Sequence, residues 1–260
     1  MGTPQWEEVS RPQSKSNRPG EYHRESSNPD FLVTLENFTT AWKDKKKVLI
    51  SEPSLGYVDY RTHESCWDLA FSLARYETES NYKFFKTMLG RMLVAYSREK
   101  FAELAVDYHF DYILYIDDDH IWPIDLFQRL QVHLDKYDII APLCVQRMTP
   151  YYPVIYKNKF TKKDDGKTYY ESDFMLDWKK GDLVEPDTIG FGCALIKVDL
   201  LRKMKKPWFF SNSTIGEDLY FCMMAKEAGA KIVVDTNIEA PHLEEGKPVS
   251  YANYERCKKN

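Results

Sequence analysis

The sequence lacks the features that would place a protein in or across a membrane. It has no apolar run long enough to cross a bilayer, and it shows no secretory leader. We therefore expect a soluble, cytoplasmic protein without stable membrane association.

Cysteine is scarce and irregularly spaced. The 5 cysteines contain no CxxC pair, which argues against both a disulfide framework and a zinc site. Most of them lie in apolar stretches, so we expect buried free thiols in a reducing compartment. They are Cys66, Cys144, Cys193, Cys222 and Cys257.

Positive charge is not in excess. The chain has 36 Lys and Arg against 40 Asp and Glu, a formal net charge of −4, so it has no global signature of nucleic-acid binding. Local basic clusters occur at 157–163 and 203–206, where a solvated face is the simpler interpretation. Aromatic residues make up 15% of the chain, which suits either stacking surfaces or a core.

Strand and helix patterns alternate through residue 145. This alternation predicts an α/β protein with a Rossmann-like, mixed but mainly parallel central sheet flanked by helices. The predicted strands of this half are 47–52, 82–89, Tyr112–Ile116 and 138–145. A helix is predicted at 62–76, with Thr62 as its candidate cap. Its apolar residues at helical spacing are Trp67, Ala70, Phe71 and Ala74.

The rest of the chain divides by composition. Residues 1–30 are polar and without periodicity, which predicts a flexible N-terminal arm. Residues 31–245 are expected to form a single domain, and 246–260 a polar C-terminal tail. Within the domain, 148–187 keeps no regular period, which predicts a small irregular excursion or lid.

Three adjacent carboxylates end the most apolar strand. Asp117, Asp118 and Asp119 follow Tyr112–Ile116, and such a cluster is costly unless a cation neutralises it. Ligands of α/β sheets bind beyond the carboxyl ends of the strands. The cluster therefore predicts a site for a divalent metal and phosphate, with an acidic loop tip as the simpler alternative.

Each of the other candidate residues has an ordinary structural interpretation as well as a functional one. Glu217 and Asp218 open a predicted helix, where the dipole favours acids, and either could also be a general base. His242 follows a predicted strand and is either a surface residue or a metal ligand. Arg98 could bind phosphate or form an ion pair.

Taken in order, these elements resemble the GT-A glycosyltransferases of the family-2-like type, including phage-encoded members. The resemblance covers about residues 46–245, with a nucleotide-sugar half at 46–147 and an acceptor half at 148–245. Asp117 and Asp119 match the DxD motif, Gly216-Glu217-Asp218 matches the "ED" motif, and His242 occupies the place of a C-terminal metal ligand. Ser97-Arg98 resembles the "aRN" segment, but Glu99 replaces its Asn.

The resemblance implies a GT-A fold and a transferase that uses a nucleotide sugar, most plausibly a UDP-sugar, with Mn²⁺ or Mg²⁺. It implies Asp119 and His242 as main metal ligands, Asp117 as a further ligand or a ribose contact, and Asp218 as base with Glu217 as the alternative. The other implied nucleotide-sugar contacts are Asp118, Arg98, Pro53 and Ser54. The implied acceptor-side residues are Gly190, Phe191, Gly192, Trp178 and Trp208.

The acceptor and two other protein classes stay open. A phage-type enzyme would work in the host cytoplasm and could modify a hydroxymethylated DNA base, a glycan or a protein. Lysines near 157–163 and nearby aromatic residues could form a nucleic-acid groove. A nucleotidyltransferase is less favoured, since 52–56 contains a single glycine where a glycine-rich phosphate loop is expected. A non-catalytic binding module is the third class.

Overall fold

The computed structural model describes residues 29–54, 56–162 and 168–259. The predicted arm lies outside these residues up to position 28, and a helix begins at Pro29. The helices are α1 (Pro29–Ala41), α2 (Tyr60–Glu79), α3 (Val94–Asp107), α4 (Leu126–Leu130), η1 (Gln131–His133), α5 (Val198–Lys203), α6 (Glu217–Glu227) and α7 (Tyr251–Lys259). The strands are β1 (Lys46–Ser54), β2 (Tyr82–Gly90), β3 (Tyr112–Ile116), β4 (Ile139–Leu143), β5 (Ile155–Lys162), β6 (Thr168–Phe174), β7 (Leu183–Val184), β8 (Thr188–Ile189), β9 (Cys193–Lys197), β10 (Ile232–Glu239), β11 (His242–Glu244) and β12 (Lys247–Val249).

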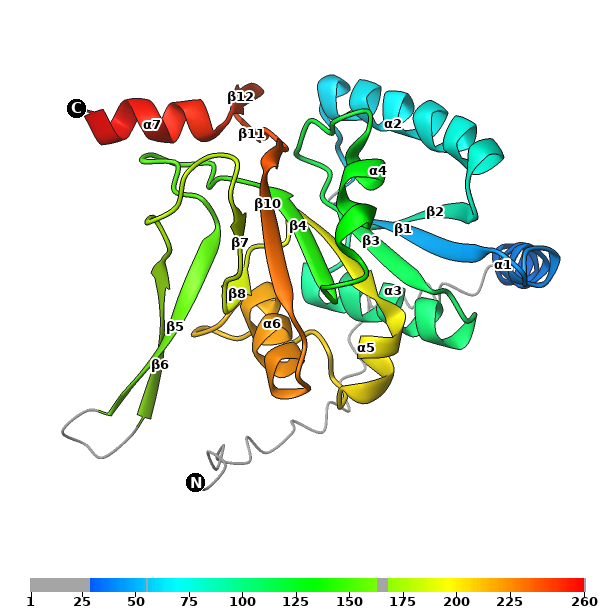
Figure 1. The fold of residues 1–260 in the computed structure, drawn as a ribbon. Coiled ribbons are helices and arrows are strands. Elements are labelled where there is room, and N and C mark those ends of the chain that lie inside the picture. Colours follow the sequence, from blue (N-terminus) through cyan, green and yellow to red (C-terminus); the bar gives the residue numbers. More distant parts are fainter. Residues whose placement is uncertain (1–28, 55, 163–167, 260) are drawn as a thin grey trace, which may run out of the picture.

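A seven-stranded sheet forms the centre, in the order β2-β1-β3-β9-β4-β10-β7 (Figure 1). Strands β1, β2 and β3 run parallel, and so do β4 and β10. Strand β9 is antiparallel between β3 and β4, and β7 is antiparallel at the edge. The predicted mixed, mainly parallel sheet is therefore confirmed.

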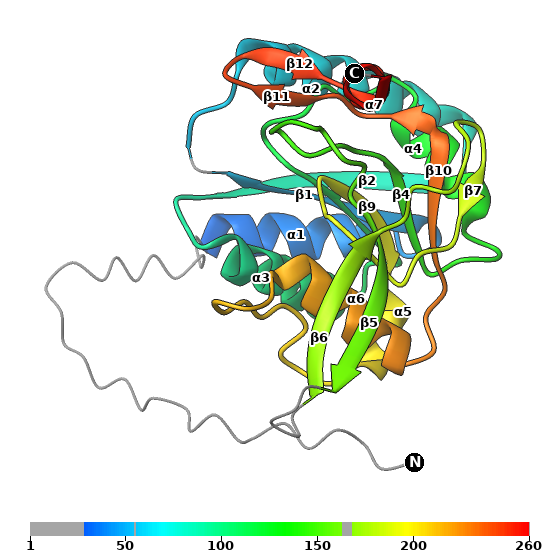
Figure 2. The same ribbon diagram turned by 90° about the vertical axis from the view of Figure 1, so that its left-hand side faces the viewer.

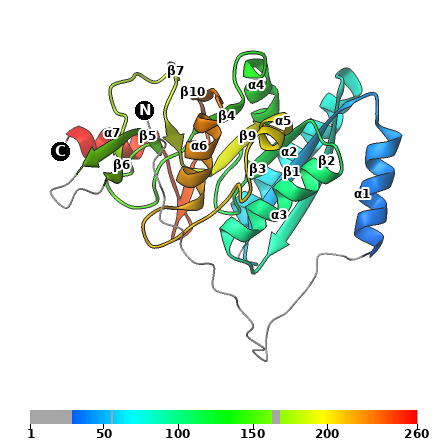
Figure 3. The ribbon, with the colours of Figure 1, turned by 90° about the horizontal axis from the view of Figure 1, so that it is seen from below.

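Both faces of the sheet are covered, because its strands are apolar at successive positions. Ile113 and Tyr115 face the core formed with α1, α3, α5 and α6. Leu114 and Ile116 face the opposite core, formed with α2 and α4. Figures 1 and 3 show these two sets of helices on opposite sides of the sheet. This two-sided burial explains why the inner strands β3 and β4 contain no charged residues.

Helix α2 differs from its prediction in its cap and in its buried face. Asp59, not Thr62, caps the helix, since its Oδ1 accepts the Arg61 backbone N–H at 2.9 Å. The buried residues of α2 are Thr62, Ser65, Leu69 and Leu73. The predicted apolar face at 67, 70, 71 and 74 is exposed to solvent instead.

The second half adds smaller elements beside the main sheet. Strands β5, β6 and β8 form an antiparallel sheet that stands apart from the central one (Figures 1 and 2). The predicted tail at 246–260 contains β12 and α7 instead, and Tyr254 is buried with its ring 5.8 Å from that of Tyr152. No helix in the described ranges has the length and apolarity that a membrane crossing requires.

Candidate functional site

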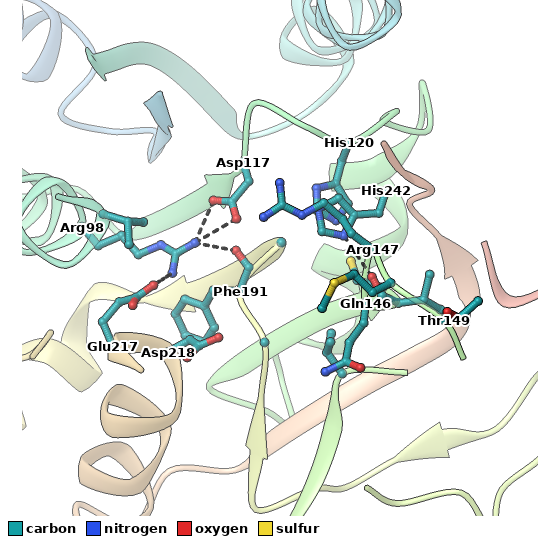
Figure 4. Close-up of a pocket in the computed structure, with 17 residues that line it drawn as sticks. Arg98, Asp117, His120, Gln146, Arg147, Thr149, Phe191, Glu217, Asp218 and His242 are labelled. Carbon is teal, nitrogen blue, oxygen red and sulfur yellow. Dashed lines mark hydrogen bonds and ion pairs between the residues drawn. The ribbon is translucent and has the colours of Figure 1, made fainter. Parts of the chain in front are cut away.

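The acids that follow β3 lie at one edge of the central sheet, beside the loop that precedes β9. The Asp117 backbone N–H donates to the Gly192 carbonyl at 2.9 Å, which joins these two segments. A cavity of about 590 Å³ opens beside them (Figure 4). Its size is typical of small-molecule sites. Among its lining residues are Arg98, Asp117, His120, Asp218 and His242.

The backbone brings His120 and His242 together from segments more than a hundred residues apart. The two residues form an isolated antiparallel β-bridge. Hydrogen bonds flank it, from the Ile121 N–H to the Pro241 carbonyl at 2.9 Å and from the Leu243 N–H to the Asp119 carbonyl at 2.8 Å. The two imidazole rings consequently stack with their centroids 4.1 Å apart.

Asp119 links the two histidines through its carboxylate. Its Oδ1 lies 3.0 Å from His120 Nδ1, and its Oδ2 lies 3.1 Å from His242 Nε2. Burial raises the pKa of Asp119, but hydrogen bonds with His120 and then His242 outweigh it and hold this pKa well below its ordinary value. Burial lowers the pKa of His120 to about 4, against the opposing effect of Asp119. His120 is therefore neutral near pH 7 and can donate a lone pair.

The hydrogen bonds of the histidines favour ligation. His242 Nδ1 lies 3.0 Å from the Val145 carbonyl oxygen, which can accept a hydrogen bond from Nδ1–H; in that tautomer the lone pair lies on Nε2, on the side of Asp119. A carbonyl in this place commonly orients a metal-bound histidine. His120 Nε2 is buried and has no hydrogen-bond partner among the described residues. Such an orphaned nitrogen is costly in a site without a ligand.

Asp119, His120 and His242, which we call the metal group, can together hold a metal ion. One ligand atom from each lies within 4.8 Å of the others. Within the described ranges, this is the one group of three or more His, Cys, Asp or Glu side chains that gathers so closely. One carboxylate and two imidazoles suit Mn²⁺ and similar transition ions better than Mg²⁺, which prefers oxygen ligands throughout.

Gly192 leaves the space that this group occupies. A Cβ atom there would lie 2.6 Å from His120 Nε2 and 3.2 Å from Cys144 Sγ. Gly190 is needed for a different reason, since its Cβ would lie 2.9 Å from the Val154 side chain. The two glycines predicted as acceptor-side residues therefore allow close packing, one against the metal group and one against an apolar side chain.

Arg98 forms a second, separate cluster on the other side of the cavity. Its Nη2 donates to Asp117 Oδ1 at 2.7 Å and to the Phe191 carbonyl at 2.8 Å, and its Nη1 donates to Glu217 Oε1 at 2.5 Å (Figure 4). The Arg98 side chain is only 3% exposed. The sequence left open whether Arg98 binds phosphate or forms an ion pair, and in the structure it is an ion-pair centre.

Arg98 binds Asp117, which lies apart from the metal group, and it binds Glu217 but not the adjacent Asp218. Burial raises the pKa of Asp117 to about 7, and Arg98 opposes this rise. Asp117 lies outside the group of three candidate ligands. Asp218 lines the cavity at the start of α6, and its Oδ1 accepts the Leu219 N–H at 2.8 Å. Asp218 is thus the acid of the pair that is not bound to Arg98.

The remaining predicted residues lie in three kinds of place. Phe191 is buried and lines the cavity, together with both flanking glycines. Trp208 is buried in the core with its Nε1 donating to the Leu201 carbonyl, and the partly buried Trp178 packs on that core. Neither lines the cavity, and their acceptor-side role stays a prediction. Three residues lie outside the cavity lining, at or beyond the carboxyl ends of β1 and β3: Pro53, Ser54 and Asp118.

Sequence reasoning missed two residues of the site. His120 directly follows the acid cluster, and this adjacency was the available signal. Arg147 follows β4, and its Nη1 lies 3.3 Å from Asp119 Oδ2 with the side chain 60% exposed. Nothing in its sequence context distinguishes Arg147 from other surface arginines.

Comparison with known proteins identifies the fold. A scan of protein-family models finds no match, and no curated protein sequence matches. Among solved structures, GalNAc-T7 with UDP, GalNAc and Mn²⁺ shows a TM-score of 0.50 at 10% identity, over 77% of this chain and 44% of that one. The chain thus spans less than half of that neighbour.

Two further solved structures are similar in outline. A197 from STIV shows a TM-score of 0.49 at 23% identity, over 80% of this chain and 91% of that chain. A putative nucleotide-diphospho-sugar transferase from Desulfovibrio desulfuricans G20 shows a TM-score of 0.38 at 10% identity, over 73% of this chain and 79% of that chain. The fold is GT-A-like, the fold of nucleotide-sugar transferases, and identities this low show the fold alone.

Proposed function

We propose that this protein is a metal-dependent glycosyltransferase, which moves a sugar from a nucleotide sugar to an acceptor hydroxyl. The observation that carries the proposal is the meeting of Asp119, His120 and His242 at one point beside the cavity that contains Asp218. The GT-A-like fold supports it, because α/β sheets bind ligands at the carboxyl ends of their strands.

We propose Mn²⁺ as the ion, held by Asp119, His120 and His242. When bound, it would supply positive charge that stabilises the diphosphate as it leaves. UDP-sugars are the first donors to test, because the neighbour GalNAc-T7 was solved with UDP, GalNAc and Mn²⁺. Asp117 would contact the ribose side of the donor, with Arg98 fixing its orientation through the ion pair at 2.7 Å.

Asp218 is the proposed general base. It would take the proton of the acceptor hydroxyl while that oxygen attacks the anomeric carbon and the bond from this carbon to the diphosphate oxygen breaks. Glu217 is less suited to this role, because its carboxylate is bound to the buried Arg98 at 2.5 Å.

A hydroxymethylated DNA base remains one acceptor hypothesis, beside a glycan or protein hydroxyl. Two of the lysines that motivated it form exposed ion pairs, since Lys157 Nζ lies 3.3 Å from Asp187 and Lys159 pairs with Asp173. Lys163 lies outside the described residues. DNA binding that weakens steeply with salt, and weakens further when the lysines of 157–163 are replaced by neutral residues, would support this acceptor. Salt-insensitive or absent binding would remove it.

Donor hydrolysis without an acceptor tests the proposed activity, because many transferases slowly transfer the sugar to water. We expect release of nucleoside diphosphate from one nucleotide sugar in a panel, with Mn²⁺ required and EDTA abolishing it. Asp119→Asn and Asp218→Asn should both lose it while remaining folded by circular dichroism. Absence of hydrolysis and of Mn²⁺-dependent nucleotide binding for the whole panel would refute the proposal.

A further inference from the structure

Helix α2 exposes a stripe of aromatic side chains that nothing in the proposed reaction uses. Trp67 is 54% exposed, Phe71 is 68% exposed and Tyr60 is 65% exposed. A single exposed aromatic residue is unremarkable, but several on one helix face make a candidate interaction surface. We define the α2 stripe as Tyr60, His63, Trp67, Ala70, Phe71 and Ala74, which lie on one side of the helix.

The stripe is ordered before any partner binds. Trp67 Nε1 donates to His63 Nε2 at 2.9 Å, one helical turn away. The rings of Trp67 and Phe71 lie 5.8 Å apart, again one turn away. Side chains that already hold one arrangement lose less conformational entropy on binding, which is a property of interface anchors.

An apolar hollow lies directly beside the stripe. It has a volume of about 290 Å³ and is enclosed between α2 and the edge of the central sheet. Ala70 and Ala74 form part of its wall on the helix side, and Phe84 and Lys86 form part of it on β2. One face of the molecule therefore carries both projecting rings and a recess whose helix side includes Ala70 and Ala74.

We propose that the α2 stripe is the interface of a twofold dimer, in which two copies of α2 pack antiparallel. A twofold interface must be complementary to itself, because the same patch serves both copies. In one antiparallel register, Trp67 of each copy covers Ala74 of the other, and the two Phe71 rings meet beside the twofold axis. Each Trp67 ring then meets a small residue beside the partner's hollow.

The charges on the flank of α2 fit the same register independently. Glu64, Asp68 and Arg75 are exposed along one side of the stripe. In the register set by the rings, Arg75 of one copy lies between Glu64 and Asp68 of the other. Opposite charges across an interface fix its register and partner choice. Two sets of residues, one apolar and one charged, thus select one arrangement.

The expected affinity is modest. An interface of one helix face per copy lies near the lower limit for a specific interface, about 1,000 Å² in total. Interfaces of this size are typically transient, so we expect the dimer to form and separate with concentration. The site cavity is lined by residues outside α2 and stays accessible in this arrangement.

Sedimentation velocity of the full-length protein, from roughly 1 to 100 µM, tests the proposal over the range that such an interface predicts. We expect a monomer–dimer equilibrium for the natural chain. Phe71→Arg should raise the dissociation constant at least about 30-fold, since it acts in both copies at the interface centre. Val132→Arg is the matched control, because Val132 is 62% exposed on η1, and it should leave the equilibrium within about twofold.

Charge exchange provides a second test that does not depend on the rings. Arg75→Glu should weaken the dimer, and adding Glu64→Lys and Asp68→Lys to the same chain should restore it. Thermal melts by circular dichroism verify folding of each variant. A natural chain that stays monomeric throughout, or a dimer unaffected by Phe71→Arg, overturns the proposal. Monomers that co-sediment with phosphatidylcholine–phosphatidylserine vesicles would also overturn it and assign the stripe to a lipid surface.

Discussion

Replacing Gly192 by alanine should perturb the metal group without removing any ligand. The new Cβ would lie 2.6 Å from His120 Nε2, whereas ordinary contacts begin near 3.4 Å. The His120 ring must therefore shift by several tenths of an ångström, away from the position that its bridge with His242 sets. Such overpacking typically costs about 1–3 kcal/mol of stability. Misplaced ligand geometry typically lowers metal affinity about 10- to 100-fold.

Gly190→Ala is the matched control. Its Cβ would lie 2.9 Å from Val154, a comparable overlap two residues away that does not involve a ligand. Isothermal titration with Mn²⁺ and a urea unfolding curve would be measured for both variants. We expect both to lose stability, and Gly192→Ala alone to lose Mn²⁺ affinity. Equal Mn²⁺ affinity in both variants and the natural chain would refute the proposed role of His120.

Three further predictions concern charge at the site. Without metal, the contribution of His120 to the free energy of unfolding should fall by up to about 3 kcal/mol as pH drops from 6.5 to 4, because the unfolded state protonates His120 first, whereas the raised pKa of Asp117 acts in the opposite direction. The difference between the urea curves of the natural chain and of His120→Asn at each pH isolates this contribution, and equal pH slopes for the two would contradict it. Arg147→Ala removes a cation 3.3 Å from Asp119. Titration at low salt should therefore show Mn²⁺ binding up to about fivefold tighter, and weaker binding would contradict this. Asp218→Asn should lower turnover at least about 100-fold with stability retained. Glu217→Gln should instead destabilise the fold by about 1–3 kcal/mol, because it weakens one charge-assisted hydrogen bond of the buried Arg98, which keeps Asp117 as a partner. The reverse pattern, from turnover and melting measurements, would exchange their roles.

The inner strands β3 and β4 could be predicted because they are buried on both faces and therefore apolar without interruption. The acid cluster after Tyr112–Ile116 stood out for the same reason, since it ends such a run. The partnership of Asp119 with His242 followed from the resemblance, and their placement 3.1 Å apart depends on the bridge between residues 120 and 242.

Other features depend on contacts that the local sequence does not encode. The side of α2 with the strongest apolar pattern is exposed to solvent, whereas its packed side includes Thr62 and Ser65. The Ser65 Oγ accepts the Trp122 backbone N–H at 3.1 Å. The two tryptophans expected near an acceptor pack in or on the core. Glu217 is bound by Arg98, a residue 119 positions earlier, and only the fold reveals that this acid is occupied.

Anomalous diffraction from crystals soaked with Mn²⁺ tests the central claim most directly. We expect one strong peak within coordination distance of Asp119, His120 and His242, which disappears in His242→Ala crystals. A peak only at other residues, or none at a Mn²⁺ concentration that saturates calorimetric binding, would contradict it.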